Sequence, residues 1–333
     1  MSHPSRVVAG IDEAGLGPLL GPMTVGWSAF RVPRGEVNLW DVLSEVVTDS
    51  PRQDSKNLVV ADSKRVFSRN PRGARRLELT VLAFLDQLDA EGCGPRTPSE
   101  LLQLPPADLQ LSAGALARHP WYSKLPESLP HAVDEGVLSI RSGKLEREMS
   151  RSGVSFLDGG CCVLPAGELN DSWQATGNKS LSQWQVSGRL LEHLWESFGE
   201  GSLSVFVDRM GGRSHYGRWL SNQFPAARVQ VRQECSPMSE YVLTQEVGGS
   251  ERRMRVVFAE RCEERSFSVA LASCFAKYGR ELGMNAFNSY FGGLQPGLKP
   301  TAGYTTDGRR WLKDAEPALS LAGVPQGVLI RNR

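Results

Sequence analysis

This chain has little of what membrane spans, secretion signals and zinc sites are built from. No apolar stretch approaches the roughly 18 residues that a membrane-spanning helix requires. The opening residues Met-Ser-His-Pro-Ser-Arg lack the apolar core of a signal peptide. The six cysteines form no Cys-x-x-Cys pair, and the five histidines do not cluster with them, which argues against a zinc site. We therefore expect an intracellular, cytoplasmic protein with free thiols and no membrane partner.

The chain also lacks an excess of charge of either sign. Its 38 Lys and Arg residues nearly balance 37 Asp and Glu residues, so the net charge of +1 does not by itself indicate a polyanion partner. Three local groups of basic residues nevertheless lie close to candidate catalytic motifs, which favours a phosphate-binding surface over ordinary solvated faces. The groups are Lys64, Arg65, Arg69, Arg72, Arg75 and Arg76; Arg209, Arg213, Arg218, Arg228 and Arg232; and Arg309, Arg310 and Lys313.

Strand-like and helix-like segments alternate along the chain, which favours an α/β fold. We expect one catalytic domain over residues 1–333, with a loop-rich, proline-rich helical insertion at 91–150 and a tail at 316–333. The insertion is expected to act as a lid or a docking element. The tail is expected either to pack on the domain or to contact nucleic acid through Arg331 and Arg333. Predicted strands are 7–11, 23–30, 154–164, 203–208, 252–259 and 265–270, and predicted helices are 73–90, 180–198 and 270–284.

The most informative segment is residues 10–22, Gly-Ile-Asp-Glu-Ala-Gly-Leu-Gly-Pro-Leu-Leu-Gly-Pro. An apolar strand delivers Asp12 and Glu13 into a stretch rich in Gly and Pro, as expected where a buried strand presents acids at a sheet edge. Because side chains alternate along a strand, these two acids share a site only where the ladder breaks, and we expect that break at Ala14-Gly15. A solvated turn is the alternative.

A second apolar strand ends in acid at Asp208 and is followed by two glycines. Two such strand ends in one sheet bring three carboxylates to one edge, where their repulsion requires a divalent cation. Mg²⁺ and Mn²⁺ prefer such all-oxygen ligands. A fourth acid, Glu281, lies on the predicted helix four residues after Lys277, although an ordinary surface ion pair is the alternative interpretation.

Five segments, in order along the chain, resemble motifs of the type 2 ribonucleases H, the ribonuclease HII family. Residues 10–22 resemble its Gly-Ile-Asp-Glu-Ala-Gly-Arg-Gly-Pro-Leu-Ala-Gly-Pro motif, and residues 62–64 its Asp-Ser-Lys-x-Leu element. Residues 205–208 are similar to the strand that carries the third acid. Residues 268–281 resemble the family's Ser-Ile-Ala-Ala-Ala-Ser-Ile-x-Ala-Lys-Val-x-Arg-Asp helix, and residues 303–306 resemble its Gly-Tyr-x-Thr element.

The resemblance implies a ribonuclease H-like fold, with a mixed β-sheet flanked by helices. It also implies a monomeric endonuclease that cuts the RNA strand of RNA–DNA hybrids or ribonucleotide-containing duplexes. Two Mg²⁺ or Mn²⁺ ions, roughly 4 Å apart, would be held by the acids. The implied catalytic and metal-binding residues are Asp12, Glu13, Asp208 and Glu281. The implied substrate-binding residues are Gly15, Leu16, Gly17, Lys64, Ser273, Lys277 and Tyr304, with Tyr304 stacking beside the 2′-hydroxyl.

Three positions depart from the family pattern. Leu16 stands where the family has a cation, Glu281 where it has Asp, and Ala302 where it has Lys. We therefore expect poor cleavage of a single-ribonucleotide duplex and a gain from Leu16→Arg, unless Leu16 packs against the fold. Alternatives are a nucleic-acid-binding protein of this fold with weak activity, or a nuclease of this fold that acts on DNA or structured RNA. A dinucleotide-binding enzyme is disfavoured by the glycine spacing.

Overall fold

The computed structural model describes residues 5–35, 37–88 and 94–332. A mixed sheet of seven strands, in the order β5-β2-β1-β6-β9-β8-β7, forms its centre, and β3 and β4 form a separate two-stranded sheet. The strands are β1 (Ser5–Ala14), β2 (Met23–Pro33), β3 (Val47–Thr48), β4 (Leu58–Val59), β5 (Ser155–Leu164), β6 (Ser202–Asp208), β7 (Arg228–Glu234), β8 (Met238–Val247) and β9 (Ser250–Ala259).

The pairing of these strands explains where the chain places its acids. The ladders β5–β2 and β2–β1 are antiparallel, β1–β6 and β6–β9 are parallel, and β9–β8 and β8–β7 are antiparallel again. The parallel strands β1, β6 and β9 therefore end at the same edge of the sheet.

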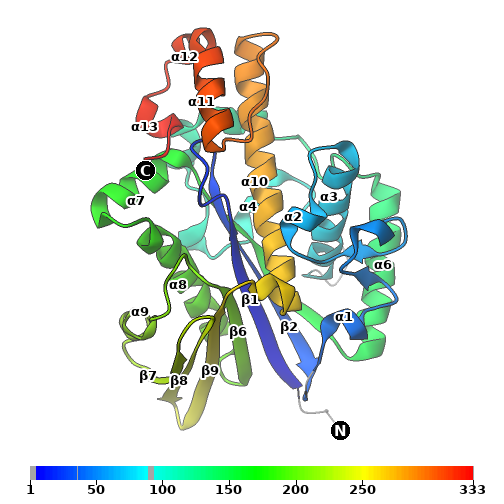
Figure 1. Ribbon diagram of the computed structural model, residues 1–333. Helices are drawn as coiled ribbons and strands as arrows, with labels where there is room; N and C mark the ends of the chain where they lie inside the picture. The colour runs from blue at the N-terminus through cyan, green and yellow to red at the C-terminus, as the bar shows by residue number, and fades with distance from the viewer. Residues whose placement is uncertain (1–4, 36, 89–93, 333) are drawn as a thin grey trace.

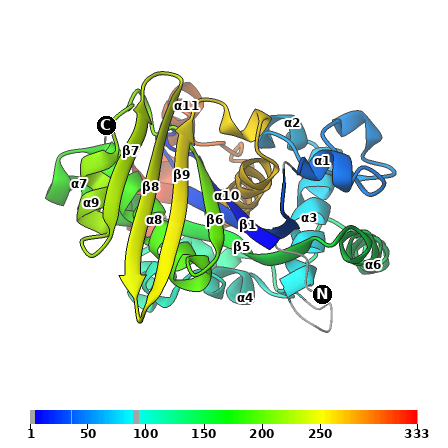
Figure 2. The same cartoon turned by 90° about the horizontal axis from the view of Figure 1, so that it is seen from below.

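Helices cover both faces of the sheet, which confirms the predicted α/β class (Figures 1 and 2). They are α1 (Leu39–Val42), α2 (Ser63–Val66), α3 (Pro71–Leu85), α4 (Pro98–Gln103), α5 (Ala113–Arg118), α6 (Glu135–Ser152), α7 (Ala166–Thr176), α8 (Lys179–Phe198), α9 (Gly217–Gln223), α10 (Phe267–Leu294), α11 (Thr305–Asp314), α12 (Glu316–Ala322) and α13 (Gln326–Leu329). Short 3₁₀ turns occur at Pro51–Gln53, Asp86–Leu88, Ala107–Leu109, Pro120–Lys124 and Cys262–Glu264.

Alternation along β1 separates two apolar cores. Val7, Ala9 and Ile11 face α8 and belong to the core on that side. Gly10 faces α10, whose backbone approaches so closely that a Cβ on Gly10 would lie 2.3 Å from the carbonyl carbon of Ser268. The small residues at the start of α10 thus allow the helix to pack directly on β1 and β2 (Figure 1).

The segment that was expected to be an insertion packs on the rest of the protein. The carboxylate of Glu78 on α3 is buried and accepts the backbone N–H groups of His131, Ala132 and Val133 at 2.6–3.1 Å. Trp121 packs with Phe287 on α10 at a ring-centroid distance of 5.2 Å. Residues 91–93 lie outside the described residues, and the proposed domain boundaries stay a prediction.

Most predicted elements are confirmed, and three differences stand out. The predicted strand 265–270 is wrong, because this stretch is a turn followed by the start of α10, where small residues favour close helix packing. The strands β7, which is polar and exposed, and β8, whose buried residues are Ser239 and Tyr241–Leu243, are not among the predicted elements. The predicted helix 270–284 corresponds to α10, which extends to Leu294, beyond the predicted end.

The described cysteines are free thiols, and Cys93 lies outside the described residues. Among the helices that the structure describes, none combines the length and the apolar character needed to cross a bilayer.

Candidate metal centre

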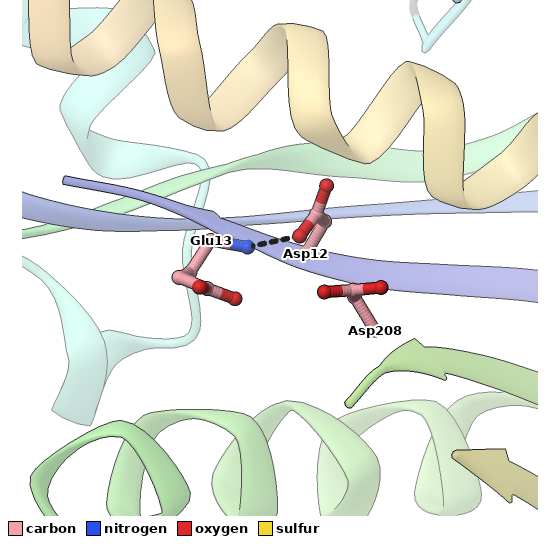
Figure 3. A group of neighbouring side chains, drawn as sticks. All are labelled: Asp12, Glu13 and Asp208. Atoms are coloured by element: carbon pink, nitrogen blue, oxygen red, sulfur yellow. Dashed lines mark hydrogen bonds between the residues drawn. The ribbon is translucent and has the colours of Figure 1, made fainter. Parts of the chain in front are cut away.

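Asp12, Glu13 and Asp208 meet at the edge where the parallel strands end. Ile11 on β1 is paired with Val207 on β6, so the next residue of each strand, Asp12 and Asp208, stands beside the other. One carboxylate oxygen from each of the three acids lies within 4.8 Å of the other two (Figure 3). The structure thus brings together three of the predicted catalytic residues from positions nearly 200 residues apart in the chain.

Glu13 reaches this group although the ladder between β1 and β2 is unbroken as far as Ala14. On the β2 side, the expected break at Ala14-Gly15 therefore does not explain how the two acids share a site. Their side chains leave β1 on opposite sides (Figure 3). On its other edge, however, β1 pairs with β6 only as far as Ile11. Asp12 and Glu13 therefore extend past the last paired residue of β1 on that side, and both carboxylates can approach Asp208.

Backbone and amide groups hold these carboxylates in place. The N–H of Glu13 donates to Oδ1 of Asp12 at 2.7 Å, and the N–H of Cys262 donates to Oδ1 of Asp208 at 3.2 Å. Gln183 on α8 donates from Nε2 to Oε2 of Glu13 at 2.9 Å. These contacts orient the acids without neutralising them.

Burial and mutual repulsion disfavour the charged forms of these acids. Burial raises the pKa of Asp12 well above its usual value, and the charges of Glu13, Asp208 and Glu263 raise it further. Burial is also the largest cause that raises the pKa of Glu13, and it raises the pKa of Asp208 to about 6. At neutral pH a cation from outside the chain would therefore stabilise this site.

Glu263 is the acid that the sequence analysis missed. It lies in the turn Cys262–Glu264, directly after the third parallel strand, β9. Its Oε2 is buried and has no hydrogen-bond partner among the described residues. Burial and then the charge of Asp208 raise its pKa, and its own charge raises that of Asp12 and of Glu13. The sequence analysis predicts the preceding strand at 252–259 but not its place beside β6, so the acid that follows it is not singled out there.

The structure does not bring Glu281 to this group. Its Oε1 lies 2.5 Å from Nζ of Lys277, and that ammonium group lies 4.6 Å from the ring centroid of Phe67. With 1.5 Å of rise per residue, Glu281 is about 20 Å along α10 from Ser268, which packs on β1. Glu281 lines a separate hollow of about 390 Å³ beside Arg69. The helical ion pair, which was the alternative interpretation, is what the structure shows.

Of the predicted binding residues, Lys64 borders the acids and Ser273 does not face them as a ligand would. The charge of Asp62 raises the pKa of Lys64 most, and Glu263, Asp12 and Asp208 raise it further. Ser273 is buried, accepts from the N–H of Ser63 at 3.2 Å and donates to a carbonyl of its own helix. It therefore fixes α2 against α10 and has no free surface for a substrate.

The loop after the acids carries Gly15, Leu16 and Gly17. Gly15 has a φ of +84°, a conformation that favours glycine. The side chain of Leu16 is half-buried against the apolar core on the α8 side, whereas Gly17 is exposed.

Tyr304 lies beside this loop. The carbonyl of Gly303 accepts the N–H groups of Leu19 and Leu20 at 2.7 and 3.1 Å, and the Tyr304 side chain is 50% exposed. Its ring is therefore accessible next to the loop.

Several residues of the basic groups are neutralised within the protein. Arg72 and Arg76 both pair with Asp54, at 2.6 and 3.1 Å. Arg209 pairs with Glu260 at 2.8 Å. In the described part of the chain, Arg69 and Arg75 are exposed and form no ion pair with an acid. Only part of the predicted basic surface is thus available for a polyanion.

The donor set at the acid edge fits a divalent cation. Asp12, Glu13 and Asp208 each offer a carboxylate oxygen to one common point, and the charge of Glu263 raises the pKa of Asp12. The ion pairs found within the described residues do not include these four acids, although Lys64 lies near them. One buried oxygen, on Glu263, has no partner. Oxygen donors of this kind suit Mg²⁺ and Mn²⁺ better than zinc.

No protein-family model and no curated protein matches this sequence. The chain is similar to solved structures of type 2 ribonucleases H. It aligns with Archaeoglobus fulgidus RNase HII, solved in complex with PCNA, at 14% identity and a TM-score of 0.41, covering 98% of this chain and 94% of that one. Pyrococcus horikoshii ribonuclease H2 aligns at 14% identity, TM-score 0.39 and 97% and 92% coverage. Aquifex aeolicus RNase H3 aligns at 16% identity, TM-score 0.42 and 97% and 71% coverage.

Proposed function

We propose that this protein is a metal-dependent endonuclease that hydrolyses the RNA strand of RNA–DNA hybrids. The observation that carries the proposal is the group formed by Asp12, Glu13 and Asp208 at the ends of two parallel strands. Burial raises the pKa of these acids although Lys64 lies near them, and holding them together costs stability unless a divalent ion binds there. The sequence motifs around them resemble those of ribonuclease HII.

In this proposal Asp12, Glu13, Asp208 and Glu263 hold Mg²⁺ or Mn²⁺, and Glu281 does not. When bound, two such ions lower the pKa of an attacking water and stabilise the charge of the leaving oxygen. The backbone N–H of Cys262 and the amide of Gln183 keep the Asp208 and Glu13 carboxylates directed at the centre.

Two side chains at the edge of the site are available to the nucleic acid. Lys64 is exposed and close to the acids, so its ammonium group is placed to contact a backbone phosphate. Tyr304 offers an exposed ring beside the loop of residues 15–17, where it can stack against a sugar.

A cleavage assay with three substrates tests the proposal. A long RNA–DNA hybrid, a DNA duplex with one ribonucleotide and an all-DNA duplex are each incubated with Mg²⁺ or Mn²⁺. We expect cleavage of the hybrid, and Asp12→Asn is expected to lower its rate about a hundredfold or more. The exposed Asp49, changed to Asn, is the matched control and should cleave at the wild-type rate.

Each other outcome contradicts a stated part of the proposal. Cleavage of DNA alone would replace the substrate with that of a different nuclease of this fold. Tight binding of the hybrid without cleavage would indicate a binding protein. Undiminished cleavage by Asp12→Asn would reject the site.

A further inference from the structure

A buried arginine holds the loop that follows the acids. Arg331 donates from Nη1 to the carbonyl of Gly15 and from Nη2 to the carbonyl of Leu16, the second at 2.7 Å. The side chain of Arg331 comes from a part of the chain more than 300 residues away from the loop. One guanidinium group therefore fixes two consecutive peptide groups, just beyond Glu13.

The segment that carries Arg331 is itself fastened on both sides. Ile330 forms a β-bridge with Leu20, and the N–H of Arg331 donates to the carbonyl of Leu19 at 2.9 Å. On the other side, Asn170 of α7 donates from Nδ2 to the carbonyl of Ile330 at 2.7 Å. Of the two roles expected for the tail, the side chain of Arg331 shows packing on the domain. Arg333 lies outside the described residues.

Burial makes the charged form of Arg331 energetically unfavourable. The residue is only 7% exposed and forms no ion pair with a carboxylate among the described residues. Burial, and then repulsion from Arg280, lower its pKa to about 9. Burying a charge without an acidic partner costs free energy, and hydrogen bonds to the guanidinium offset part of that cost. Here those hydrogen bonds go to the two loop carbonyls.

The direction of those carbonyls determines where the loop's N–H groups point. The peptide bonds here are trans, so the N–H that follows each carbonyl points the opposite way. With the carbonyls of Gly15 and Leu16 turned inward to Arg331, the N–H groups of Leu16 and Gly17 point outward. No hydrogen bond within the described residues uses either group, and Gly17 has open space around its α-carbon.

We propose that Arg331 is a positioning residue that sets the backbone of residues 15–17, so that the N–H groups of Leu16 and Gly17 donate to an oxygen of the nucleic-acid strand. Adjacent backbone N–H groups bind anionic and hydroxyl oxygens well, and the guanidinium strengthens them by polarising the peptide groups. This inference rests on the proposed function, and it assigns this contact to the loop's backbone, because the Leu16 side chain packs inward.

Binding measurements with three variants test it. Arg331→Ala removes the guanidinium, and Arg331→Lys keeps a donor. Asn170→Ala is the matched control, because it removes hydrogen bonds to the same segment and none to residues 15–17. Duplex Kd is measured in Ca²⁺ for a duplex with one ribonucleotide and for its all-DNA counterpart, alongside the Tm of each variant and its Mn²⁺ affinity.

We expect Arg331→Ala to raise the duplex Kd about tenfold while Mn²⁺ affinity is unchanged, and Arg331→Lys to recover part of that loss. Asn170→Ala should lower the Tm yet leave Kd within about twofold. Weakening of both duplexes identifies a phosphate oxygen as the acceptor, and weakening of the ribonucleotide duplex alone identifies the 2′-hydroxyl. Equal effects of Arg331→Ala and Asn170→Ala at equal loss of Tm would overturn the proposal.

A measurement without nucleic acid separates this proposal from the proposed function. The ¹⁵N order parameters of Leu16 and Gly17 should fall in Arg331→Ala and stay high in Asn170→Ala. If the loop loosens but wild-type protein binds no duplex, the proposed function fails and the positioning role stands. If the loop remains ordered in Arg331→Ala, the positioning role fails whatever the binding data show.

Discussion

The acid edge of the sheet and the middle of α10 differ in whether their acids have a cationic partner. At the acid edge, Asp12, Asp208 and Glu263 lie together with no cation from the described residues paired to them, and their pKa values are raised. On α10, Glu281 has a lysine within 2.5 Å. Since the chain neutralises acids elsewhere, the unpaired group at the strand ends is the one whose partner must come from outside. Lys64 lies near the acid edge without forming an ion pair there, and this lack of a paired cation distinguishes the group from the Glu281–Lys277 pair.

Replacing one acid of each region by glutamine tests the difference between the two regions most directly. We expect Glu263→Gln to lower cleavage of an RNA–DNA hybrid at least about tenfold and to weaken Mn²⁺ binding, because it removes a charge at the centre. Glu281→Gln, a change of the same chemistry on α10, should alter both by less than about twofold. Cleavage rates at saturating Mn²⁺ and Mn²⁺ titrations of both variants provide the test. The reverse ranking would return Glu281 to the site.

The cost of the unpaired acids also predicts a dependence of stability on pH in metal-free protein. The pKa of Asp208 rises from 3.8 to about 6 on folding, so between these values the folded protein binds more protons than the unfolded chain. The stabilisation is therefore complete below about pH 4 and is lost as the pH rises through 6, by at most about 3 kcal/mol.

Urea unfolding in EDTA between pH 4 and 8 measures this loss. Asp208→Asn should flatten the profile, and Mn²⁺ should restore stability most strongly above pH 7. A wild-type profile that rises with pH over this range would contradict the raised pKa.

The part of this site that could be predicted follows from local patterns. The strands ending at Asp12 and Asp208 are short apolar runs that end in acid, and their parallel pairing brings the acids together. Glu263 could not be predicted in this way, because its role depends on β9 joining the sheet next to β6, a long-range pairing. Arg331 lies still further from the pattern, since nothing near it in sequence indicates the loop at residues 15–17. Contacts between distant segments decided what the sequence left open.

Leu16 packs inward at a position where the ribonuclease HII motif that this segment resembles has a cation. Leu16 lines a cavity of about 20 Å³ with Leu169 and Trp173, and Arg331 lies there as well. This packing favours the second of the two outcomes considered for Leu16→Arg, because the longer cation meets an apolar wall and another guanidinium. We expect a loss of about 1–3 kcal/mol in the free energy of unfolding, against less than about 1.5 kcal/mol for Leu16→Met. Thermal unfolding measures both, and a stable Leu16→Arg protein with faster cleavage at a single ribonucleotide would contradict this reasoning.

The basic group around α3 contains both free and ion-paired arginines, and these should differ in how they affect the salt dependence of binding. Arg69 and Arg75 are exposed without an acidic partner in the described structure, whereas Arg72 is bound to Asp54 at 2.6 Å. If this face follows a nucleic-acid backbone, each free arginine that contacts a phosphate adds a little under one unit to the salt dependence of binding. Changing Arg69 and Arg75 to Gln should therefore lower the slope of log K against log salt by up to about two units. Arg72→Gln should leave the slope nearly unchanged, because Asp54 already offsets that charge in the free protein. Equal slopes for all variants would make the whole group an ordinary solvated face and place the nucleic acid elsewhere on the protein.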